Sequence, residues 1–317
     1  MIEKIAIGVL AYNEGKHIHS VLNDLIKLNL PIYIVNDFSN DDTQEILSKF
    51  KSENIKVILN SKNIGAGAST KKLFQKASED GYDFLIKVDG DGQFSQSDII
   101  KIVDLYKTNK YDFIKSNRFW SEGIKGEIPK IRFFGNLFAT LLLQITAGTN
   151  KLYDPLNGLF GVSLKIIDFL NDKKYPRRYG YPYFITVVAT LNNFKTYQIN
   201  NVVEYGKQES NLSSLKVFFT ILKLTTIFYI RKYRQKKLLG KYQRSALFDV
   251  LFFWTFCISV IIFVFIIYIS FYATFSFIST GNLLILYFVF LFISIISFVN
   301  SFKEEKNIRN EYIEVEI

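Results

Sequence analysis

Short apolar runs and amphipathic segments alternate along the first 120 residues. Runs rich in β-branched and aromatic residues predict strands at residues 5–10, 32–35, 57–59, 84–88 and 113–115. Between them, apolar residues recur at helical spacing in residues 18–28, 43–50, 68–77 and 99–106. Strands and helices in regular alternation predict an α/β fold, in which helices cover both faces of a mostly parallel sheet.

Residues 250–302 contain no charged side chain. Within them, residues 250–269 and 283–302 form two almost wholly apolar stretches. As helices rising about 1.5 Å per residue, both are long enough to cross a hydrocarbon core of roughly 30 Å. We expect two transmembrane helices over residues 249–303, joined by a turn at Ser279-Thr280-Gly281-Asn282. The alternative is a buried helical hairpin in a soluble protein.

Basic residues crowd the approach to the first apolar stretch, and no acidic residue lies among them: Arg231, Lys232, Arg234, Lys236, Lys237, Lys241 and Arg244. Such basic flanks stay on the cytoplasmic side of a membrane. Two spans would return the tail, residues 304–317, to that same side. We therefore expect an integral protein of the cytoplasmic membrane, with its main domain and both termini in the cytoplasm.

Two further segments favour the membrane surface over the membrane interior. Residues 131–147 are strongly apolar but carry Arg132, Asn136 and Gln144, which predicts a helix in the membrane interface. Residues 211–248 predict an amphipathic, basic juxtamembrane segment. Ordinary core packing is the alternative for both. Residues 1–210 then form the main domain, in which residues 121–129, with two glycines and a proline, predict a loop.

The net charge of +10 is unevenly placed. Residues 1–100 hold 11 basic and 14 acidic side chains, whereas residues 101–248 hold 25 basic and 9 acidic ones. A positive segment beside membrane spans favours an anionic lipid or a phosphate as partner, and no motif typical of nucleic-acid binding is present. The only cysteine, Cys257, excludes a disulfide framework. His17 and His19 would point to different sides of a helix, which favours a solvated helix face over a zinc site.

The strongest candidate for chemistry is Asp89-Gly90-Asp91-Gly92-Gln93, which directly follows a predicted buried strand. Mg²⁺ and Mn²⁺ prefer oxygen ligands and bridge well to phosphate oxygens. Two carboxylates at a strand end can therefore hold a divalent metal against a diphosphate. For this motif taken alone, an Asp-Gly turn without a ligand is the alternative.

Polar loops follow each of the first four predicted strands. Parallel strands end at one edge of a sheet, so these loops are expected to gather there. Tyr12 can stack on a base, and the carboxylates of Glu14 and Asp37 can accept hydrogen bonds from ribose hydroxyls or base N–H groups. Turn formation or helix capping is the alternative for each loop alone. The loop residues predicted to form a nucleotide site here are Ala11, Tyr12, Asn13, Glu14, Asp37, Ser39, Asn63, Gly67 and Asp89.

Together these loop motifs and the Asp-x-Asp motif resemble those of glycosyltransferase family 2, which has the GT-A nucleotide-sugar fold. The resemblance covers about residues 3–235 and is closest to the polyprenol-phosphate glycosyltransferases of the dolichol-phosphate mannosyltransferase type. It implies a nucleotide held by Tyr12, Glu14 and Asp37. It also implies a divalent metal, Mg²⁺ or Mn²⁺, bound by Asp89, Asp91 and Gln93. The two-span hairpin is similar to that of bacterial members of the group.

The resemblance continues into the basic half of the chain. Ser116-Asn117-Arg118-Phe119 resembles the family's Ser-Arg strand end. It implies an acceptor phosphate held by Arg118, Arg132, Asn136 and Lys207. Arginine suits this role because its fork binds phosphate through two hydrogen bonds and stays charged. Asn136 stands where serine is common, and residues 207–210 depart from the later Arg-x-x-Gly-x-Ser pattern.

Asp154-Pro155-Leu156-Asn157-Gly158 resembles the element that shapes the sugar pocket in this family. The resemblance implies donor contacts from Asp154 and Asn157. The residues predicted to act in catalysis are Asp89, Asp91, Arg118 and Arg132.

The expected reaction is the inverting transfer of a sugar from a UDP- or GDP-linked donor to a polyprenyl phosphate, dolichyl or undecaprenyl, at the cytoplasmic membrane face. A sugar hydroxyl acceptor needs a general base, but no acidic residue lies between Asp172 and Glu204. A phosphate acceptor is already anionic near neutral pH, because its second pKa is about 6. The lipid-phosphate oxygen can therefore displace the diphosphate directly.

Three other functions compete with this one. The nearest is a transferase of the same fold acting on a sugar hydroxyl of a polysaccharide or glycolipid. Neither Trp120 nor Trp254 lies in the Gln-x-x-Arg-Trp motif usual in its processive members. A membrane scaffold with a decayed nucleotide pocket is disfavoured by the intact Asp89 and Asp91. A dinucleotide-dependent dehydrogenase would rest on residues 65–67, which lack a third glycine. The oligomeric state stays open, and a homo-oligomer is compatible with the sequence.

Overall fold

The computed structural model describes residues 4–50, 52–109, 111–119, 130–201, 214–238, 243–272, 277–309 and 313–315. The chain divides into two units. The first comprises Met1–Ala147, Lys151–Thr226 and Tyr312–Ile317, and the second comprises Gly148–Asn150 and Ile227–Glu311. The loop predicted at residues 121–129 lies outside the described residues.

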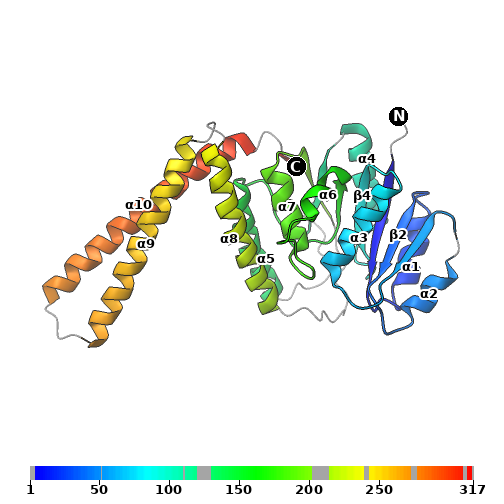
Figure 1. The fold of residues 1–317 in the computed structure, drawn as a ribbon, viewed down its shortest axis with the longest axis horizontal. Coiled ribbons are helices and arrows are strands. Elements are labelled where there is room, and N and C mark those ends of the chain that lie inside the picture. The colour runs from blue at the N-terminus through cyan, green and yellow to red at the C-terminus, as the bar shows by residue number, and fades with distance from the viewer. Residues whose placement is uncertain are drawn as a thin grey trace. The chain divides into compact units, whose positions relative to one another are not determined.

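The first unit is built on an eight-stranded sheet in the order β3-β2-β1-β4-β6-β5-β7-β8 (Figure 1). Its strands are β1 Ile5–Ala11, β2 Ile32–Asn36, β3 Ile55–Leu59, β4 Phe84–Asp89, β5 Phe113–Asn117, β6 Phe160–Ser163, β7 Thr196–Asn200 and β8 Ile313–Val315. β6 runs antiparallel to both β4 and β5, whereas the other described pairings are parallel. The carboxyl ends of β1 to β5 and of β7 therefore lie at one edge, which confirms the predicted mostly parallel sheet.

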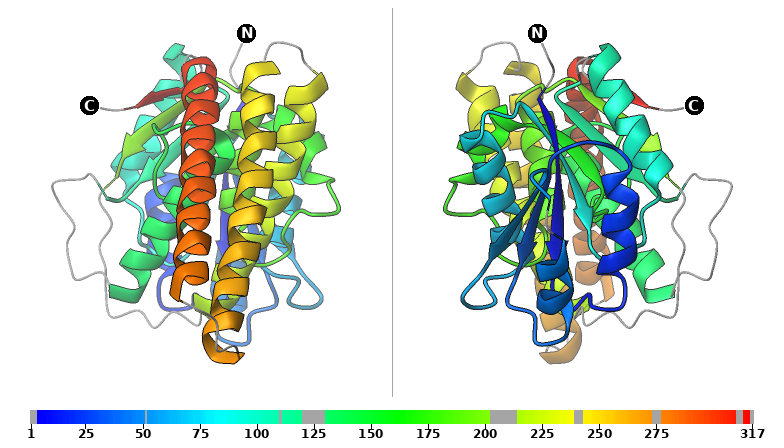
Figure 2. Two further views of the ribbon diagram at one scale, coloured as in Figure 1. Left: turned by 90° about the vertical axis from the view of Figure 1, so that its left-hand side faces the viewer. Right: turned by 90° about the vertical axis from the view of Figure 1, so that its right-hand side faces the viewer.

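Helices cover both faces of this sheet (Figure 2). Those of the first unit are α1 Ile18–Ile26, α2 Thr43–Lys49, α3 Ala66–Glu79, α4 Gln96–Asn109, α5 Lys130–Ala147, α6 Ile167–Leu170 and α7 Tyr181–Leu191, with a 3₁₀ turn at Leu164–Ile166. Ile7 and Val9 of β1 share a core with buried residues of α1 and α4. Successive strand residues point to opposite faces. Gly8 accordingly faces α3, where a Cβ would lie 3.2 Å from Leu73 Cδ1.

All nine elements predicted up to residue 115 are present, with ends that differ by at most three residues. β6, α7, β7 and β8 are elements that the sequence pattern does not predict. For α7 the reason is physical, because all of its residues are buried and its sequence carries no amphipathic period. β8, at the end of the predicted tail, pairs with β7 in the register Thr196↔Ile313 and thereby joins the sheet.

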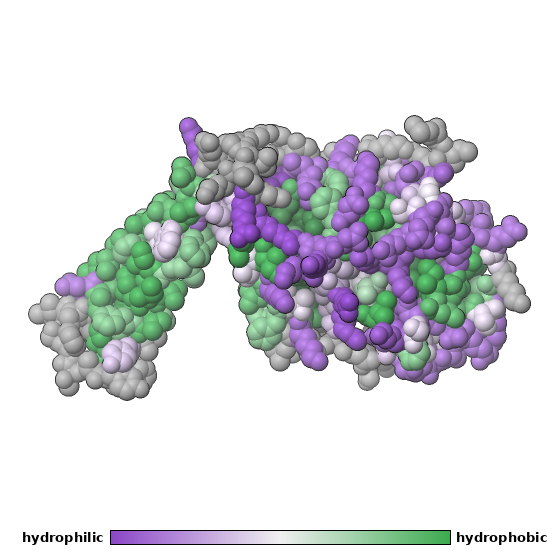
Figure 3. All heavy atoms as spheres, in the orientation of Figure 1, coloured by the Kyte–Doolittle hydropathy of each residue, from purple (hydrophilic) through white to green (hydrophobic). Residues whose placement is uncertain are grey.

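The second unit contains the two helices predicted to span a membrane. α8, Ser214–Leu238, begins in the first unit, and α9 Gln243–Tyr272 and α10 Phe277–Arg309 follow it. Arg244–Ile266 and Gly281–Lys306 are long and apolar enough to cross a membrane, and only 22% and 11% of their most apolar windows are buried in the protein. Figure 3 shows apolar side chains gathered along both helices.

The turn predicted at residues 279–282 is wrong, because α10 already begins at Phe277 and includes these residues. A single helical glycine such as Gly281 costs only about 1 kcal/mol. In a lipid environment, moreover, backbone groups need partners within the helix. The connection between α9, which ends at Tyr272, and α10 therefore precedes these polar residues in the chain.

Charged side chains are buried where the second unit's helices pack together. Lys232 of α8 lies 3.1 Å from Glu305 of α10, and both side chains are at most 3% exposed. Tyr229 donates to Asp249 Oδ1 at 3.2 Å, and Ser301 donates to the same oxygen at 2.5 Å. Part of the basic flank before the first span is thus neutralised inside the protein.

α5 has two apolar faces, only one of which belongs to the core. Ala139 and Leu143 are buried, whereas Phe134 and Leu137 remain 64% and 56% exposed. On the neighbouring part of α8, Phe219 is 63% exposed. An exposed apolar helix face of this kind fits the membrane-interface helix predicted at residues 131–147.

Candidate functional site

Carboxylates from the ends of β4 and β1 crowd together at the edge of the sheet. Asp89 ends β4, and Asp91 follows Gly90, where a Cβ would lie only 2.8 Å from the Leu10 carbonyl oxygen. Burial, followed by the charges of Asp91 and Asp89, raises the pKa of Glu14 to about 8. Burial, followed by the Asp89 charge, raises the pKa of Asp91 to about 6. Such concentrated negative charge is the chemistry of a cation site.

The donor set at this strand end fits a hard divalent cation in part. Carboxylate oxygens are the ligands that Mg²⁺ and Mn²⁺ prefer. Over the described part of the chain, no three His, Cys, Asp or Glu side chains are arranged to hold a metal. Asp89 and Asp91 therefore need further ligands, such as Gln93, water or phosphate oxygens. The Gln93 N–H donates to Asp91 Oδ1 at 3.1 Å, so these two residues share one turn.

Lys87 is a buried cation beside this site and is absent from the predicted set. Its Nζ forms an ion pair with Asp89 Oδ1 and lies 5.4 Å from the centre of the Tyr181 ring. Burial alone would lower the pKa of Lys87, but the Asp89 charge and Tyr181 raise it above its usual value. Gly158 makes room for the pair, because a Cβ there would overlap the Asp89 carboxylate. A lysine within an otherwise apolar strand is the signal that could have identified it.

The loops after β1 and β2 are held together by hydrogen bonds. The Asn13 N–H donates to Ser39 Oγ at 2.9 Å, and the Asn40 N–H donates to Asn13 Oδ1 at 2.8 Å. Two predicted ligands therefore shape the loops themselves. Tyr12 and Phe38, by contrast, project from these loops and are 44% and 49% exposed. Both rings can stack on a base, and Phe38 is a candidate that the sequence pattern does not single out.

Asp37 follows β2, and its carboxylate is engaged within the protein. Its Oδ1 accepts from the Ile64 N–H at 2.8 Å and from Asn60 Nδ2 at 2.9 Å, and its Oδ2 accepts from the Gly65 N–H at 2.8 Å. Its own N–H donates to the carbonyl of the buried Ala11 at 2.9 Å. Asp37 thus organises the loop after β3.

Gly67, at the start of α3, packs against another loop of the first unit. Its N–H donates to the Arg178 carbonyl at 3.1 Å, and a Cβ on it would overlap the Pro176 carbonyl oxygen. Close backbone approach therefore explains this glycine, and its N–H already has a partner within the protein. Asn63, earlier in the same loop, has a buried Oδ1 that no described residue hydrogen-bonds.

Arg118, just after β5, forms a largely buried ion pair with Asp154, which precedes β6. Arg118 donates from Nε to Asp154 Oδ2 and from Nη2 to Asp154 Oδ1, both at 2.7 Å. Asp154 has a left-handed φ of 51°, a strained conformation that surrounding bonds must maintain. Its N–H donates to Thr140 Oγ1 at 3.3 Å, and its carbonyl accepts from the buried Lys115. Arg118, predicted to hold the acceptor phosphate, and Asp154, predicted to contact the donor, thus form one ion pair.

Two asparagines border this ion pair. Asn157 donates from Nδ2 to Asp154 Oδ2 at 3.1 Å and to Asn201 Oδ1 at 3.2 Å. Asn136 lies one helical turn before Thr140 on α5, and its Oδ1 is buried without a partner in the described segments. Residues four apart share a helix face, so Asn136 lies on the face that meets the Asp154 loop. Lys207 and the side chain of Arg132 lie outside the described residues.

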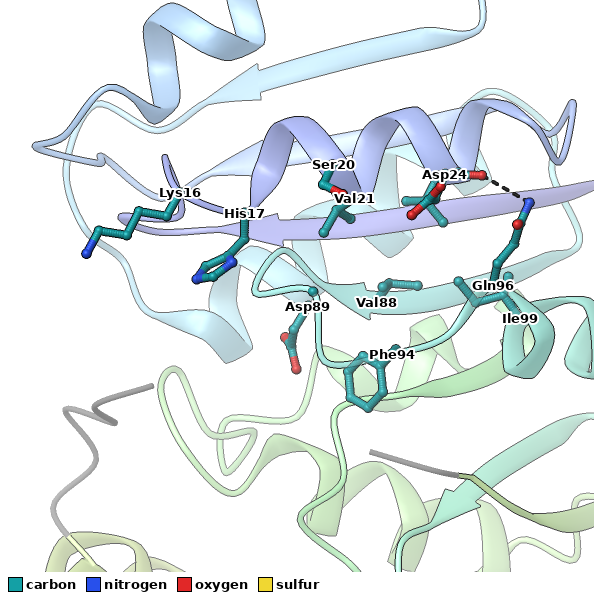
Figure 4. A pocket seen from close by; sticks show the side chains of 12 residues that line it. Lys16, His17, Ser20, Val21, Asp24, Val88, Asp89, Phe94, Gln96 and Ile99 are labelled. Carbon is teal, nitrogen blue, oxygen red and sulfur yellow. Dashed lines mark hydrogen bonds between the residues drawn. The ribbon is translucent and has the colours of Figure 1, made fainter. Parts of the chain in front are cut away.

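A cavity of about 190 Å³ opens beside Asp89, between α1 and the segment that leads into α4 (Figure 4). It is lined by Lys16, His17, Ser20, Val21, Asp24, Leu25, Val88, Asp89, Gly92, Phe94, Gln96 and Ile99. His17 and Phe94 face the same space as Asp89. His17, for which a solvated helix face is predicted, therefore borders the candidate site, while His19 is exposed.

Several known proteins are similar to this chain. The family model of glycosyl transferase family 2 matches residues 6–167. An uncharacterized protein of Methanocaldococcus jannaschii is 28% identical over 219 residues, which are 67% of this chain and 93% of that protein. The UDP-N-acetylglucosamine–dolichyl-phosphate N-acetylglucosaminyltransferase of Methanococcus voltae is 28% identical over 248 residues, 71% of this chain and 97% of that enzyme. Among solved structures, S. aureus TarS in complex with UDP-GlcNAc has a TM-score of 0.49 at 18% identity, covering 73% of this chain and 69% of that one.

Proposed function

Because the chain belongs to glycosyl transferase family 2, we propose that it transfers a sugar from a UDP- or GDP-linked donor to a polyprenyl phosphate, with inversion at the anomeric carbon. The observation that carries this proposal is the likeness to the Methanococcus voltae enzyme, whose name gives dolichyl phosphate as the acceptor. The alignment spans 97% of that enzyme. Its donor, UDP-N-acetylglucosamine, is therefore the first to test.

The donor half of the proposed site lies at the ends of β1, β2 and β4. The exposed rings of Tyr12 and Phe38 would stack on the base. Asp89, Asp91 and Gln93 would hold Mg²⁺ or Mn²⁺ against the diphosphate, which fits the crowded carboxylates there. When bound, the cation supplies stabilisation of the charge that develops on the leaving diphosphate.

The acceptor half of the proposed site lies beyond β5. Arg118 and Arg132 would position a phosphate oxygen for attack on the anomeric carbon from the side opposite the diphosphate. The new C–O bond forms as the bond to the diphosphate breaks, and the diphosphate leaves with the electron pair. No proton has to be removed from an ionised phosphate, which suits a chain without an acidic residue between Asp172 and Glu204.

A lipid acceptor is supported by the apolar surfaces of the protein. Phe134 and Leu137 of α5 are exposed in the unit that carries the site, and two apolar helices follow in the chain. Such surfaces suit an enzyme that meets its acceptor at a bilayer.

The cytoplasmic orientation remains part of the proposal. β8 pairs with β7 in the sheet that carries the site, and α9 and α10 lie between them in sequence. If both helices span, the chain crosses twice and returns to its starting side. The basic residues before the first span favour the cytoplasm as that side.

The test is a transfer assay with the purified full-length protein in nanodiscs. Labelled UDP-N-acetylglucosamine, UDP-glucose and GDP-mannose are each supplied with dolichyl or undecaprenyl phosphate and with Mg²⁺ or Mn²⁺. Extraction into organic solvent should recover the label as a lipid-linked sugar. Label that enters only an oligosaccharide or polymer would contradict the proposal and favour a hydroxyl acceptor.

A further inference from the structure

Within the described part of the chain, the polar cluster around Asp154 contains a buried hydrogen-bond donor that has no partner. Asn201 directly follows β7, is 0% exposed, and its Nδ2 has no hydrogen-bond partner among the residues that the structure describes. Buried polar groups nearly always find a partner, and leaving a donor unsatisfied is costly. An orphaned amide therefore calls for an explanation, and a bound ligand atom is one.

The neighbouring side chains decide which way this amide points. Asn157 accepts from the Leu159 N–H through Oδ1 at 3.1 Å and donates to the Asp154 carboxylate through Nδ2 at 3.1 Å. The Asn157 amide therefore cannot be reversed without losing both bonds. The second N–H of Asn157 Nδ2 points to Asn201. Asn201 must therefore accept this hydrogen bond through its Oδ1, at 3.2 Å. The NH₂ group of Asn201 is consequently the end of the amide that lacks a partner in the part of the chain that the structure describes.

The backbone places Asn201 at the edge of the sheet where the site lies. Its N–H donates to the Asn117 carbonyl at 3.0 Å, which extends the pairing of β7 with β5 by one residue. Arg118 follows Asn117 directly. Asn201 also lies six residues before Lys207, a predicted ligand of the acceptor phosphate.

The charges around Asn201 favour an anionic ligand. Arg118 pairs with the Asp154 carboxylate, and Lys115 donates to the Asp154 main-chain carbonyl, so the cluster holds two basic groups and one acidic group. Burial lowers the pKa of Lys115 to about 8, which leaves it mostly protonated at neutral pH. A neutral N–H donor beside a cluster with excess positive charge suits a phosphate oxygen better than a neutral hydroxyl.

We propose that the side-chain amide of Asn201 donates a hydrogen bond to an oxygen of the acceptor's phosphate, beside Arg118. This inference rests on the proposed function and adds a residue to its acceptor site. The donor's diphosphate offers the same chemistry, and the experiment separates the two sources.

The most informative variant is Asn201→Asp. Asp keeps the oxygen that accepts from Asn157, but it puts a second, anionic oxygen where the NH₂ group was. Asn201→Ala removes the amide altogether. The matched control is Asn192→Ala at the end of α7, whose Nδ2 donates to the Val188 carbonyl at 2.8 Å. All are prepared as full-length protein in nanodiscs, and melting temperatures establish that each is folded.

Two quantities are measured for each variant: the KM for polyprenyl phosphate at saturating donor, and the affinity for UDP by calorimetry. Losing one hydrogen bond to a charged group should raise the acceptor KM by about tenfold in Asn201→Ala. Asn201→Asp should raise it further through repulsion, although its melting temperature stays near that of wild type. UDP affinity should change less than twofold in both, and Asn192→Ala should leave the acceptor KM unchanged.

Three outcomes would overturn the inference. An acceptor KM for Asn201→Asp equal to that of wild type would mean that the amide only fills the core. A loss of UDP affinity with an unchanged acceptor KM would assign the phosphate to the donor. Equal effects in Asn192→Ala would make the change a general loss of stability. If the wild-type protein neither binds nor glycosylates polyprenyl phosphate, the proposed function fails first, which is a distinguishable result.

Discussion

Arg118 and Asp154 are joined by two parallel hydrogen bonds of 2.7 Å, and the Arg118 N–H adds a third to Asp154 Oδ2 at 3.1 Å. The Asp154 side chain is fully buried, and that of Arg118 is 15% exposed. Burial alone would raise the pKa of Asp154, but the Arg118 charge and its hydrogen bonds bring it below the usual value. Through this pair, the loop predicted to shape the sugar pocket and the arginine predicted to hold the acceptor depend on each other.

Asp154→Asn should destabilise the protein strongly, because it leaves the Arg118 guanidinium without its carboxylate. Breaking one partner of a buried pair costs about 3–5 kcal/mol. The melting temperature in detergent should fall by several degrees. Glu45→Gln, which breaks the exposed pair with Lys49, is the control and should change it little. Equal shifts in melting temperature for the two variants would show that the buried pair contributes no more stability than the exposed pair.

Asp91→Asn should lower transfer activity by a factor on the order of 100 while the protein stays folded, because the proposed cation loses one of its two carboxylates. Chelation should inactivate the wild type, and added Mn²⁺ or Mg²⁺ should restore it. Asp104→Asn, an exposed change on α4, is the control. Full turnover in excess chelator would refute metal dependence.

The raised pKa of Glu14 predicts a pH dependence of stability. Its value in the folded protein, about 8, lies above the usual 4.5, so the folded state binds this proton more tightly than the unfolded state. Stability should therefore fall as the pH rises from about 4.5 to about 8. Glu14→Gln should flatten this fall, measured as melting temperature against pH in chelator. An unchanged slope would mean that burial and the charges of Asp91 and Asp89 do not raise the pKa of Glu14.

Arg132→Ala should raise the acceptor KM at least tenfold, because one or two charge-assisted bonds to phosphate contribute about 1.5–3 kcal/mol each. Calorimetry with nucleotide and metal should show donor binding little changed. Arg132→Lys should rescue only in part, since lysine lacks the planar fork. The control is Lys107→Ala, an exposed cation on α4. A change confined to the donor KM would indicate that Arg132 binds the donor and not the acceptor.

The orientation can be tested by single-cysteine labelling in a Cys257→Ser background. Ser61→Cys is an exposed position after β3, whereas the neighbouring Asn60 is buried and donates to Asp37, so it is a poor probe. Ser276→Cys lies between the two spans in sequence. An impermeant reagent should label Ser276→Cys in intact cells, and Ser61→Cys only after permeabilisation. Labelling of Ser61→Cys in intact cells, with Ser276→Cys labelled only after permeabilisation, would show that the topology is opposite to the proposed one.

Much of the site could be predicted because its signals are local. The strands and helices up to β5 follow from apolar periodicity within windows of a few residues. Parallel strands end at one edge of the sheet, so their order in the chain suffices to gather Tyr12, Glu14, Asp89 and Asp91 there. The two apolar stretches of the second unit are equally local, since length and the absence of charge define them.

Only the tertiary structure decided what these polar residues contact. Arg118 and Asp154 are 36 residues apart, and Asn157 and Asn201 are 44 apart. These pairs meet because β6 inserts antiparallel between β4 and β5, a sheet order that no local period encodes. The physical reason is that periodicity reports which face of an element is buried, whereas a hydrogen bond depends on which distant element covers that face. The sequence alone therefore determined the elements and the edge at which they end. The packing between them determined which polar groups are satisfied and which, like the Asn201 amide, lack a partner among the described residues.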